Sequence, residues 1–273
     1  MDTTLYHPGV SDGSVKVLTR VIAGLIPRRK RKYPLELVVR AILHRVDNGC
    51  KWRALDRAAL PWHVAYDYYR RWASSNVMDR ANRLIVRVTR TLVAFAASGR
   101  ARAEPTAACV DSQSVKSRVW GRRDDRGFDG HKSVNGVKYH LATDTRGYVL
   151  ACVCGPASAH DSTYVYDVAH AIRWSGWRRV GVAFCDAAYR GATPAAAARR
   201  FGIELEVTTL QDAKRLKASG FAPAPKRWVV ERTFSNLAWS RAVAQSYERK
   251  RDHVEANVLW ASMRLCLRQL EKV

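Results

Sequence analysis

Three carboxylates, Asp111, Asp186 and Glu231, lie in local settings that could direct their side chains at one metal site. Asp111 and Asp186 each end an apolar run, and such runs are typical of buried strands. Glu231 lies in a stretch with helical spacing. Ligands at the ends of two strands and on a packed helix can converge, and Mg²⁺ and Mn²⁺ prefer carboxylate oxygens. The order Asp, Asp, Glu therefore indicates metal-dependent cutting or joining of nucleic acid.

Each of these acids also has a plain structural interpretation. Asp111 could cap a turn, and Asp186, which precedes small residues, is equally ambiguous. Glu231 alone could pair with Arg227 or Arg232 on a helix surface. What favours the metal site is the joint occurrence of the three acids on a strongly basic chain.

The charge balance predicts a polyanionic partner. The chain carries 47 Lys and Arg residues against 24 Asp and Glu residues, which gives a net charge of +23 and an isoelectric point of about 10.3. Residues 1–100 hold 19 basic and 7 acidic residues, and residues 101–273 hold 28 and 17, so the excess is spread over the whole chain. A nucleic acid is the partner that such a balance predicts.

A basic run near the N-terminus is the strongest local candidate for phosphate contact. It consists of Arg28, Arg29, Lys30, Arg31 and Lys32 and is bracketed by two prolines. Such a run could be merely solvated, but its place beside a helical region that is itself basic favours contact with DNA phosphates.

Several other classes of protein are disfavoured. No stretch reaches the roughly 18 apolar residues of a spanning helix, and the start of the chain lacks a secretory signal. We therefore expect no membrane partner and a cytoplasmic, nucleoid-associated location. The six cysteines lie mostly in apolar runs, so reduced core residues are predicted, and even Cys152 and Cys154 fit packing better than a zinc site. The sequence contains no Gly-rich phosphate loop, so a nucleoside triphosphate is not implied.

Helical spacing dominates the first hundred residues. Helices are predicted over residues 34–48, 61–73 and 78–97. An aromatic stripe over residues 62–72 is expected to pack these helices together. The periodicity is lost over residues 100–105, which suggests a linker. We therefore predict a helical, basic DNA-binding domain over residues 1–100 and a catalytic domain over residues 101–273.

Short strands alternate with helices beyond the linker. Strands are predicted over 137–143, 148–154, 180–185 and 203–208, and helices from about 161, from 193, over 226–245 and over 252–270. The first two strands form a hairpin around residues 144–147. This order predicts an α/β fold, a mixed sheet flanked by helices, after a small all-helical region.

Other acids in the second half have simpler interpretations. Asp161 follows His160, as in some metal phosphohydrolases, but a helix cap is favoured because the further ligands of such sites are missing. Asp144 fits the hairpin turn. Asp129 lies in a segment of mixed charge, together with Asp124 and Asp125, for which a solvated loop is the plainer interpretation.

A series of short motifs runs from about residue 28 to residue 270. They are Asn-Gly-Cys-Lys-Trp-Arg at 48–53, Asp-Ser-Gln-Ser at 111–114, Gly-His-Lys at 130–132, Lys-Tyr-His at 138–140, Asp-Thr-Arg-Gly at 144–147, His-Asp at 160–161, Asp-Ala-Ala-Tyr-Arg-Gly at 186–191 and Arg-Trp-Val-Val-Glu-Arg at 227–232. Individually weak but specific in this order, they resemble bacterial insertion-sequence transposases of the Asp-Asp-Glu type, which have a ribonuclease H-like catalytic domain.

This resemblance implies roles for individual residues. Asp111, Asp186 and Glu231 would be the catalytic metal ligands, holding two Mg²⁺ or Mn²⁺ ions that clamp the scissile phosphate. Arg227, four residues before the Glu, would touch DNA phosphate. The implied activity is binding of terminal inverted repeats, followed by metal-dependent DNA cleavage and strand transfer.

The chain departs from the family pattern around the third acid. Positions that commonly hold Trp, a basic residue, Tyr and a second Lys are here Asn236, Ala238, Ala224 and Ser133. The resemblance thus implies a complete metal site with fewer groups to hold the DNA. Arg241, together with Trp239, is expected to compensate as a DNA contact.

Two other functions stay open at this point. One is a ribonuclease H-like nuclease or resolvase, which cuts strands without joining them. The other is a catalytically weakened, transposase-derived DNA-binding protein. The oligomeric state is not determined by the sequence, and a homodimer or higher oligomer on DNA fits the prediction.

Overall fold

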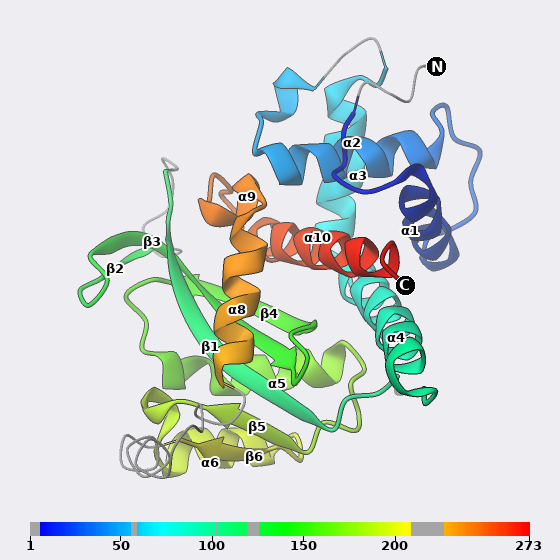
Figure 1. The fold of residues 1–273 in the computed structure, drawn as a ribbon. Coiled ribbons are helices and arrows are strands. Elements are labelled where there is room, and N and C mark those ends of the chain that lie inside the picture. Colours follow the sequence, from blue (N-terminus) through cyan, green and yellow to red (C-terminus); the bar gives the residue numbers. More distant parts are fainter. Residues whose placement is uncertain (1–5, 56–58, 102, 119–125, 209–226) are drawn as a thin grey trace. The chain divides into compact units, whose positions relative to one another are not determined.

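Helices form in the first hundred residues where the apolar spacing predicts them. The structure, a computed structural model, describes residues 6–55, 59–101, 103–118, 126–208 and 227–273, with only the backbone of Arg227. The helices of this region are α1 (Asp12–Leu25), α2 (Leu35–Asn48), the 3-10 helix η1 (Trp52–Ala54), α3 (Trp62–Ala73) and α4 (Val77–Ser98) (Figure 1). Gly49 ends α2 with a φ of 63°, and its N–H donates to the Arg45 carbonyl. Helix α1 was not predicted from the sequence.

The C-terminal helices pack with these N-terminal helices. The chain divides into a helical unit, residues 1–103 and 237–273, and a sheet unit, residues 104–236. The helical unit also contains α9 (Arg241–Ala244) and α10 (Arg251–Leu270). Helix α10 contacts α2, α3, α4 and α9 and is buried around most of its circumference. It therefore forms the centre of this unit.

The aromatic stripe on α3 packs against α10 as well as against α2 and η1. The Tyr69 hydroxyl donates to the His253 carbonyl at 2.6 Å and to Asn257 Oδ1 at 2.8 Å. The ring centroids of Trp72 and Trp260 lie 6.1 Å apart. The stripe is thus a core feature, as predicted, and one of its partners is a helix from the far end of the chain.

The division of the chain differs from the predicted boundaries at the C-terminal end. The change near residue 103 lies close to the predicted linker, whereas residues 237–273 fall in the helical unit and not with the sheet. Residues 237–273 belong to the helical unit because the N-terminal helices cover the apolar surface of α10. The assignment of DNA binding and catalysis to the two parts stays a prediction.

The sheet unit contains one six-stranded mixed sheet. Its elements are β1 (Ala107–Lys116), β2 (Gly127–Asp129), β3 (Val134–Asp144), β4 (Val149–Pro156), η3 (Asp161–Tyr164), α5 (Val165–Trp174), β5 (Val182–Cys185), η4 (Ala187–Tyr189), α6 (Ala192–Arg199), β6 (Glu204–Val207) and most of α8 (Arg227–Ala238). The strand order is β2-β3-β1-β5-β6, and β4 also pairs with β3. Strand β1 runs antiparallel to β3 and parallel to β5.

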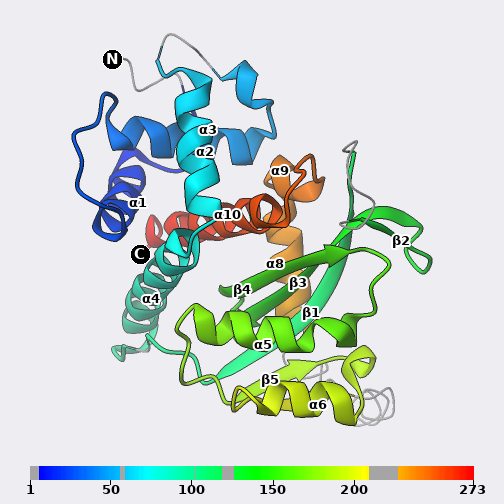
Figure 2. The same cartoon turned by 180° about the vertical axis from the view of Figure 1, so that it is seen from behind.

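Helices cover both faces of this sheet. Figures 1 and 2, seen from opposite sides, place α8 on one face and α5 on the other. Helix α5 contacts β3, β4 and α6. This arrangement, after a helical N-terminal region, confirms the predicted α/β class, a ribonuclease H-like mixed sheet flanked by helices.

Helix α8 packs on the turn between β3 and β4. The Thr233 hydroxyl donates to the Gly147 carbonyl at 3.0 Å, and Arg232 Nη2 donates to the Arg146 carbonyl at 3.0 Å. Gly147 has a φ of 95°, and a Cβ there would lie 2.8 Å from Thr233 Oγ1. Asp144 Oδ1 accepts the N–H groups of Arg146 and Tyr148, which confirms its predicted place in the hairpin turn.

Five of the six cysteines are buried and all six are free thiols, in agreement with the prediction of reduced core residues. No helix among the described residues is long and apolar enough to cross a membrane.

Candidate active site

Asp111 on β1 and Asp186 directly after β5 lie close to one another, because β1 and β5 are adjacent parallel strands. Cys109 pairs with Phe184 in the β1–β5 register, and two further residues along each chain lead to Asp111 and Asp186. Asp186 follows the end of β5, as predicted. Asp111 does not end its strand, because β1 continues to Lys116 along its ladder with β3. The two acids nevertheless meet at the carboxyl end of β5, where ligand sites of parallel sheets form.

Local hydrogen bonds hold each of these carboxylates. Asp111 Oδ1 accepts the N–H of Ser112 at 2.8 Å. Asp186 Oδ1 accepts the N–H of Ala188 at 2.9 Å and so caps η4. Both side chains are half-buried. The N–H of a residue one or two positions further along the chain therefore holds one oxygen of each carboxylate.

A polar cavity of about 420 Å³ opens next to the two acids. Its charged and polar lining residues are Asp111, Ser112, Asp129, His131, Lys132, Lys138, Ser158, His160, Asp161 and Asp186. They come from β1, β2, β3 and the segments around η3 and η4. The cavity has the volume of a small-ligand site, enough for a phosphodiester group.

Asp161 faces this cavity and is held by Lys138. Lys138 Nζ lies 2.9 Å from Asp161 Oδ1 and 2.7 Å from the Ala159 carbonyl. Burial would raise the pKa of Asp161, but hydrogen bonds from Lys138 and Ser112 and the nearby positive charge outweigh it and lower the pKa. The predicted role of Asp161 as a helix cap is wrong, because the cap of η3 is His160, whose Nδ1 accepts the Ser162 N–H.

Asp129 is a second acid that the structure places differently from the prediction. It is only 8% exposed, and it accepts hydrogen bonds from the Ser114 hydroxyl and from the N–H groups of His131 and Lys132. These bonds, that of Ser114 first, lower its pKa. The interpretation as a solvated residue is therefore wrong for Asp129, whereas Asp124 and Asp125 lie outside the described residues.

His140 lies within reach of the charges of Lys138 and Asp161. It is fully buried, and its ring stacks on that of Tyr164 with centroids 4.2 Å apart. Burial outweighs the opposing charge of Asp161 and lowers the pKa of His140 to about 4, so the ring is neutral near pH 7. Lys138 and His140 alternate along β3, a signal that places both on one face of the sheet.

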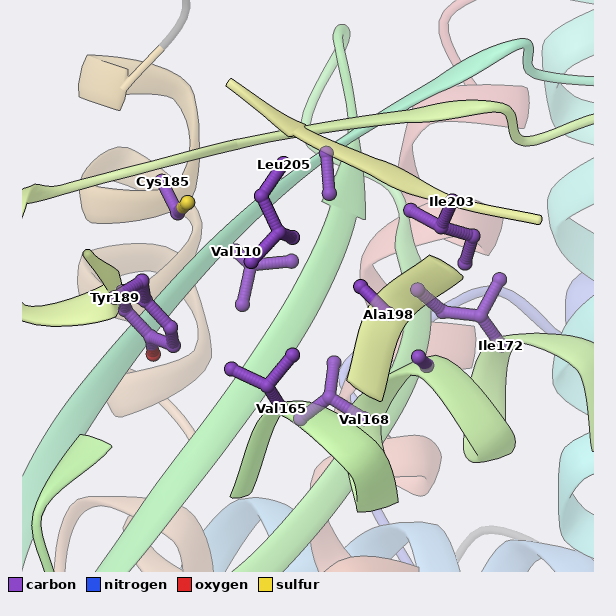
Figure 3. Close-up of a pocket in the computed structure, with 11 residues that line it drawn as sticks. Val110, Val165, Val168, Ile172, Cys185, Tyr189, Ala198, Ile203 and Leu205 are labelled. Atoms are coloured by element: carbon purple, nitrogen blue, oxygen red, sulfur yellow. The ribbon is translucent and has the colours of Figure 1, made fainter. Parts of the chain in front are cut away.

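Tyr189 belongs to the motif at residues 186–191, but the motif predicted no role for it. Its ring lies among apolar side chains between the sheet and helices α5 and α6, around a gap of only about 10 Å³ (Figure 3). Burial, together with the charges of Asp161, Asp111 and Asp186, raises the pKa of its hydroxyl well above the ordinary value. The single Tyr between small residues after Asp186 is the signal that could have identified it.

The structure brings Asp111 and Asp186 together but does not place Glu231 with them. Glu231 is exposed on α8 and does not line the cavity. Within the described ranges, no group of three or more His, Cys, Asp or Glu side chains is arranged to hold a metal ion. Two adjacent carboxylates beside a polar cavity still form a donor set of hard oxygens that suits Mg²⁺ or Mn²⁺. Glu231 as a third ligand stays a prediction.

The predicted DNA contacts lie in different parts of the chain. The basic run occupies the loop between α1 and α2, where all its members except Arg31 are exposed, and Arg31 Nη2 bonds to the Pro27 carbonyl at 3.2 Å. Arg241 begins α9 with an exposed side chain. A Cβ added at Gly49 would lie 2.8 Å from the Cβ of Arg241. Arg227 begins α8, and its side chain lies outside the described residues.

The Lys138–Asp161 pair leads to a first prediction. Asp161→Asn keeps the shape of the side chain but leaves the ammonium of Lys138, which is 9% exposed, without its counter-charge. We expect a loss of about 1 to 3 kcal/mol in the free energy of unfolding, measured by urea denaturation. Asp167→Asn on the exposed side of α5 is the control and should change it by less than about 0.5 kcal/mol. Equal stability of both variants would show that the pair is fully solvated.

Comparisons with known proteins match both parts of the chain. Residues 102–267 match a family model described as "Transposase DDE domain", and residues 18–82 match one described as "Putative transposase of IS4/5 family". A "Putative transposase for insertion sequence element IS402" from Burkholderia cepacia is 31% identical over 144 residues. That match covers 50% of this chain and 66% of the relative, which is just under two thirds of its length.

Proposed function

Because this chain belongs to the family of proteins with a transposase DDE domain, we propose that it is a DNA transposase of an insertion sequence. It would bind the terminal inverted repeats of its element and catalyse metal-dependent DNA strand cleavage and strand transfer. Its partner is double-stranded DNA, at the element ends and at the target, in the cytoplasm. The observation that carries the proposal is the pair Asp111 and Asp186, which lie on and directly after adjacent parallel strands beside a polar cavity.

We assign the metal ligands of this reaction to Asp111, Asp186 and Glu231. DDE transposases generally use divalent metal ions, and a bound Mg²⁺ or Mn²⁺ would lower the barrier by neutralising charge on the scissile phosphate and activating the attacking oxygen. Asp111 and Asp186 supply carboxylates from a rigid pair of strands, which suits a site that must hold its geometry. Glu231 would complete the set from α8, which packs on the β3–β4 turn.

The basic groups around this site would hold the DNA. Lys138 is fixed by Asp161 and Ala159 at the cavity wall, so it contributes a positioned positive charge near the phosphate. Arg227, the basic run and Arg241 would contact the DNA backbone. These contacts position the duplex without selecting its sequence.

A strand-transfer assay on a pre-cut element end separates this function from its alternatives. A transposase joins the free 3′ end to target DNA when a divalent metal is present. Cutting without joining would instead identify a ribonuclease H-like nuclease or resolvase. DNA binding with neither reaction would identify a catalytically weakened DNA-binding protein.

The basic run leads to a prediction about salt dependence. Each phosphate that a basic side chain neutralises contributes roughly −0.9 to the slope of log affinity against log salt. Replacing residues 28–32 by Ala should therefore flatten this slope by roughly 2 to 4 in binding assays with duplex DNA. The full chain is used because α10 forms the centre of the helical unit.

A matched control is available on α3. Arg70 and Arg71 are exposed but already paired with Asp67, at 3.4 and 3.8 Å. Replacing both by Ala should change the slope less per residue. An unchanged slope after replacement of residues 28–32 would mean that the run is solvated and makes no phosphate contact.

A further inference from the structure

The turn between β2 and β3 is held by a carboxylate to which the proposed reaction gives no role. Asp129 ends β2, and it is 8% exposed. Its Oδ2 accepts the Ser114 hydroxyl at 2.5 Å, and its Oδ1 accepts the N–H groups of His131 and Lys132, each at 3.1 Å. An Asp that accepts the N–H groups two and three residues further along the chain fixes the conformation of a turn.

The position of this turn in the sheet explains why it needs such support. Strand β2 lies at one end of the strand order, beside β3 (Figure 1). Ser133 in the turn has a φ of 52°, which is unfavourable for a residue other than Gly. Ser114 belongs to β1, which pairs with both β3 and β5. The bonds of Asp129 therefore tie a short edge hairpin to a central strand of the sheet.

The turn contributes exposed residues to the cavity of Asp111 and Asp186. His131 and Lys132 are exposed, and both line that cavity. Gly130 also lines it, and a Cβ added there would meet no atom within 4 Å. The turn is thus accessible to a ligand that enters the cavity. An accessible lysine in the same lining as the two acids suits a second phosphate of a DNA strand whose scissile phosphate lies at these acids.

The register of the sheet limits how far this second phosphate lies from the first. Leu141 on β3 pairs with Asp111, and Val134 on β3 pairs with Asp129. These two positions are seven residues apart on β3, which is at most roughly 23 Å at about 3.3 Å per residue. One strand of a DNA duplex advances about 3.4 Å per nucleotide. The turn therefore lies within about seven nucleotides of the scissile phosphate.

We propose that the turn at residues 129–133 binds a phosphate of the cleaved DNA strand beside the scissile phosphate, with Lys132 as the contacting group and Asp129 as the positioning residue that holds the turn. This inference rests on the proposed function, because it takes the cavity of Asp111 and Asp186 as the place of the scissile phosphate. It gives Asp129 a role through its hydrogen bonds and not as a metal ligand.

The test is a scan of single phosphates on a duplex that contains the uncut element end. Each phosphate within about seven nucleotides of the scissile one is replaced in turn by a neutral methylphosphonate, and the affinity of the full-length protein is measured without metal. At one position the replacement should weaken binding to the wild type by about 2- to 5-fold. In Lys132→Ala this position should lose its effect, and the slope of log affinity against log salt should flatten by roughly 0.9.

Two variants of Asp129 separate positioning from charge. Asp129→Ala removes both acceptor oxygens, so the turn is no longer held and the sensitive position should lose its effect. Asp129→Asn keeps an oxygen for the N–H groups of His131 and Lys132, so the position should stay sensitive. Arg178→Ala is the control for Lys132→Ala, because Arg178 is exposed before β5 and outside the cavity lining, and it should leave the scan unchanged.

The outcomes separate this inference from the proposed function. An identical scan in wild type and Lys132→Ala would show that the turn contacts no phosphate, and this variant changes an exposed side chain, so it decides the matter even if Asp129→Ala does not fold. Loss of the sensitive position in Asp129→Asn would overturn the positioning role of Asp129. A wild type that shows the expected scan but neither cuts nor joins strands would overturn the proposed function alone. Absence of binding to the element end would overturn both.

Discussion

Asp111→Asn, Asp186→Asn and Glu231→Gln are each expected to abolish metal-dependent strand cleavage while leaving the fold and the DNA affinity intact. Asn and Gln keep the size of the side chain but lose the charge that holds a divalent ion. The loss in cleavage rate should be at least about 10³-fold, the upper end for removing one electrostatic contact in an active site. Single-turnover cleavage of a labelled element end measures it, and a filter-binding assay without metal measures DNA affinity.

Glu231→Gln is the most informative of the three changes. Asp111 and Asp186 line the same cavity, whereas Glu231 is exposed on α8 and outside the cavity lining. A fully active Glu231→Gln enzyme would show that the third ligand is another acid, and Asp161 would then be tested next. Asp67→Asn, an exposed acid paired with Arg70, is the control and should cleave like the wild type.

Glu248→Gln is expected to destabilise the helical unit strongly. Glu248 forms a buried ion pair with Arg45 at 2.5 Å, and their side chains are 9% and 7% exposed. The guanidinium of Arg45 also lies 4.8 Å from the ring centroid of Trp52 and donates to Asn257 Oδ1 at 2.9 Å. Removing the carboxylate charge leaves this buried cation uncompensated, so we expect a loss of about 3 to 5 kcal/mol in the free energy of unfolding.

The same ion pair makes the free energy of unfolding depend on pH in the acid range. Burial would raise the pKa of Glu248, but hydrogen bonds and charges from His253 and Arg45 lower it from 4.5 to about 2. A lowered pKa in the folded state means that the stabilisation is complete above pH 4.5 and is lost as the pH falls toward 2. For this pKa shift the stabilisation that Glu248 contributes above pH 4.5 amounts to roughly 3 kcal/mol.

Urea denaturation at pH 7, 4.5, 3 and 2 measures this dependence. The wild type should lose more stability across the acid range than Glu248→Gln, because the variant lacks the titrating group. Glu204→Gln is the matched control, since the Arg199–Glu204 pair is about 60% exposed on both sides and should contribute less than about 1 kcal/mol. Parallel pH profiles for wild type and Glu248→Gln would contradict the buried pair.

The sequence alone determined most of the elements and the position of Asp186 directly after a strand, whereas Asp111 lies within its strand and not at its end. Apolar spacing predicted α2, α3, α4 and α10, and continuous apolar runs predicted β5 and the β3–β4 hairpin. Gly49 and the Asp144 turn followed from local backbone requirements. These features depend on neighbours within one or two turns of chain, so a local pattern carries them. The order of the short motifs along the chain resembles that of a known family and so indicated the family.

Only the tertiary structure decided which residues share a site. The register of β1 against β5 places Asp111 beside Asp186, and no local signal fixes the pairing of strands 75 residues apart. The contact of Lys138 with Asp161 made the acid a cavity residue instead of a helix cap. Because α10 packs against the N-terminal helices, the C-terminal helices belong to the helical unit. Each of these outcomes depends on long-range burial of apolar surface and charge, which acts between segments that sequence spacing does not connect.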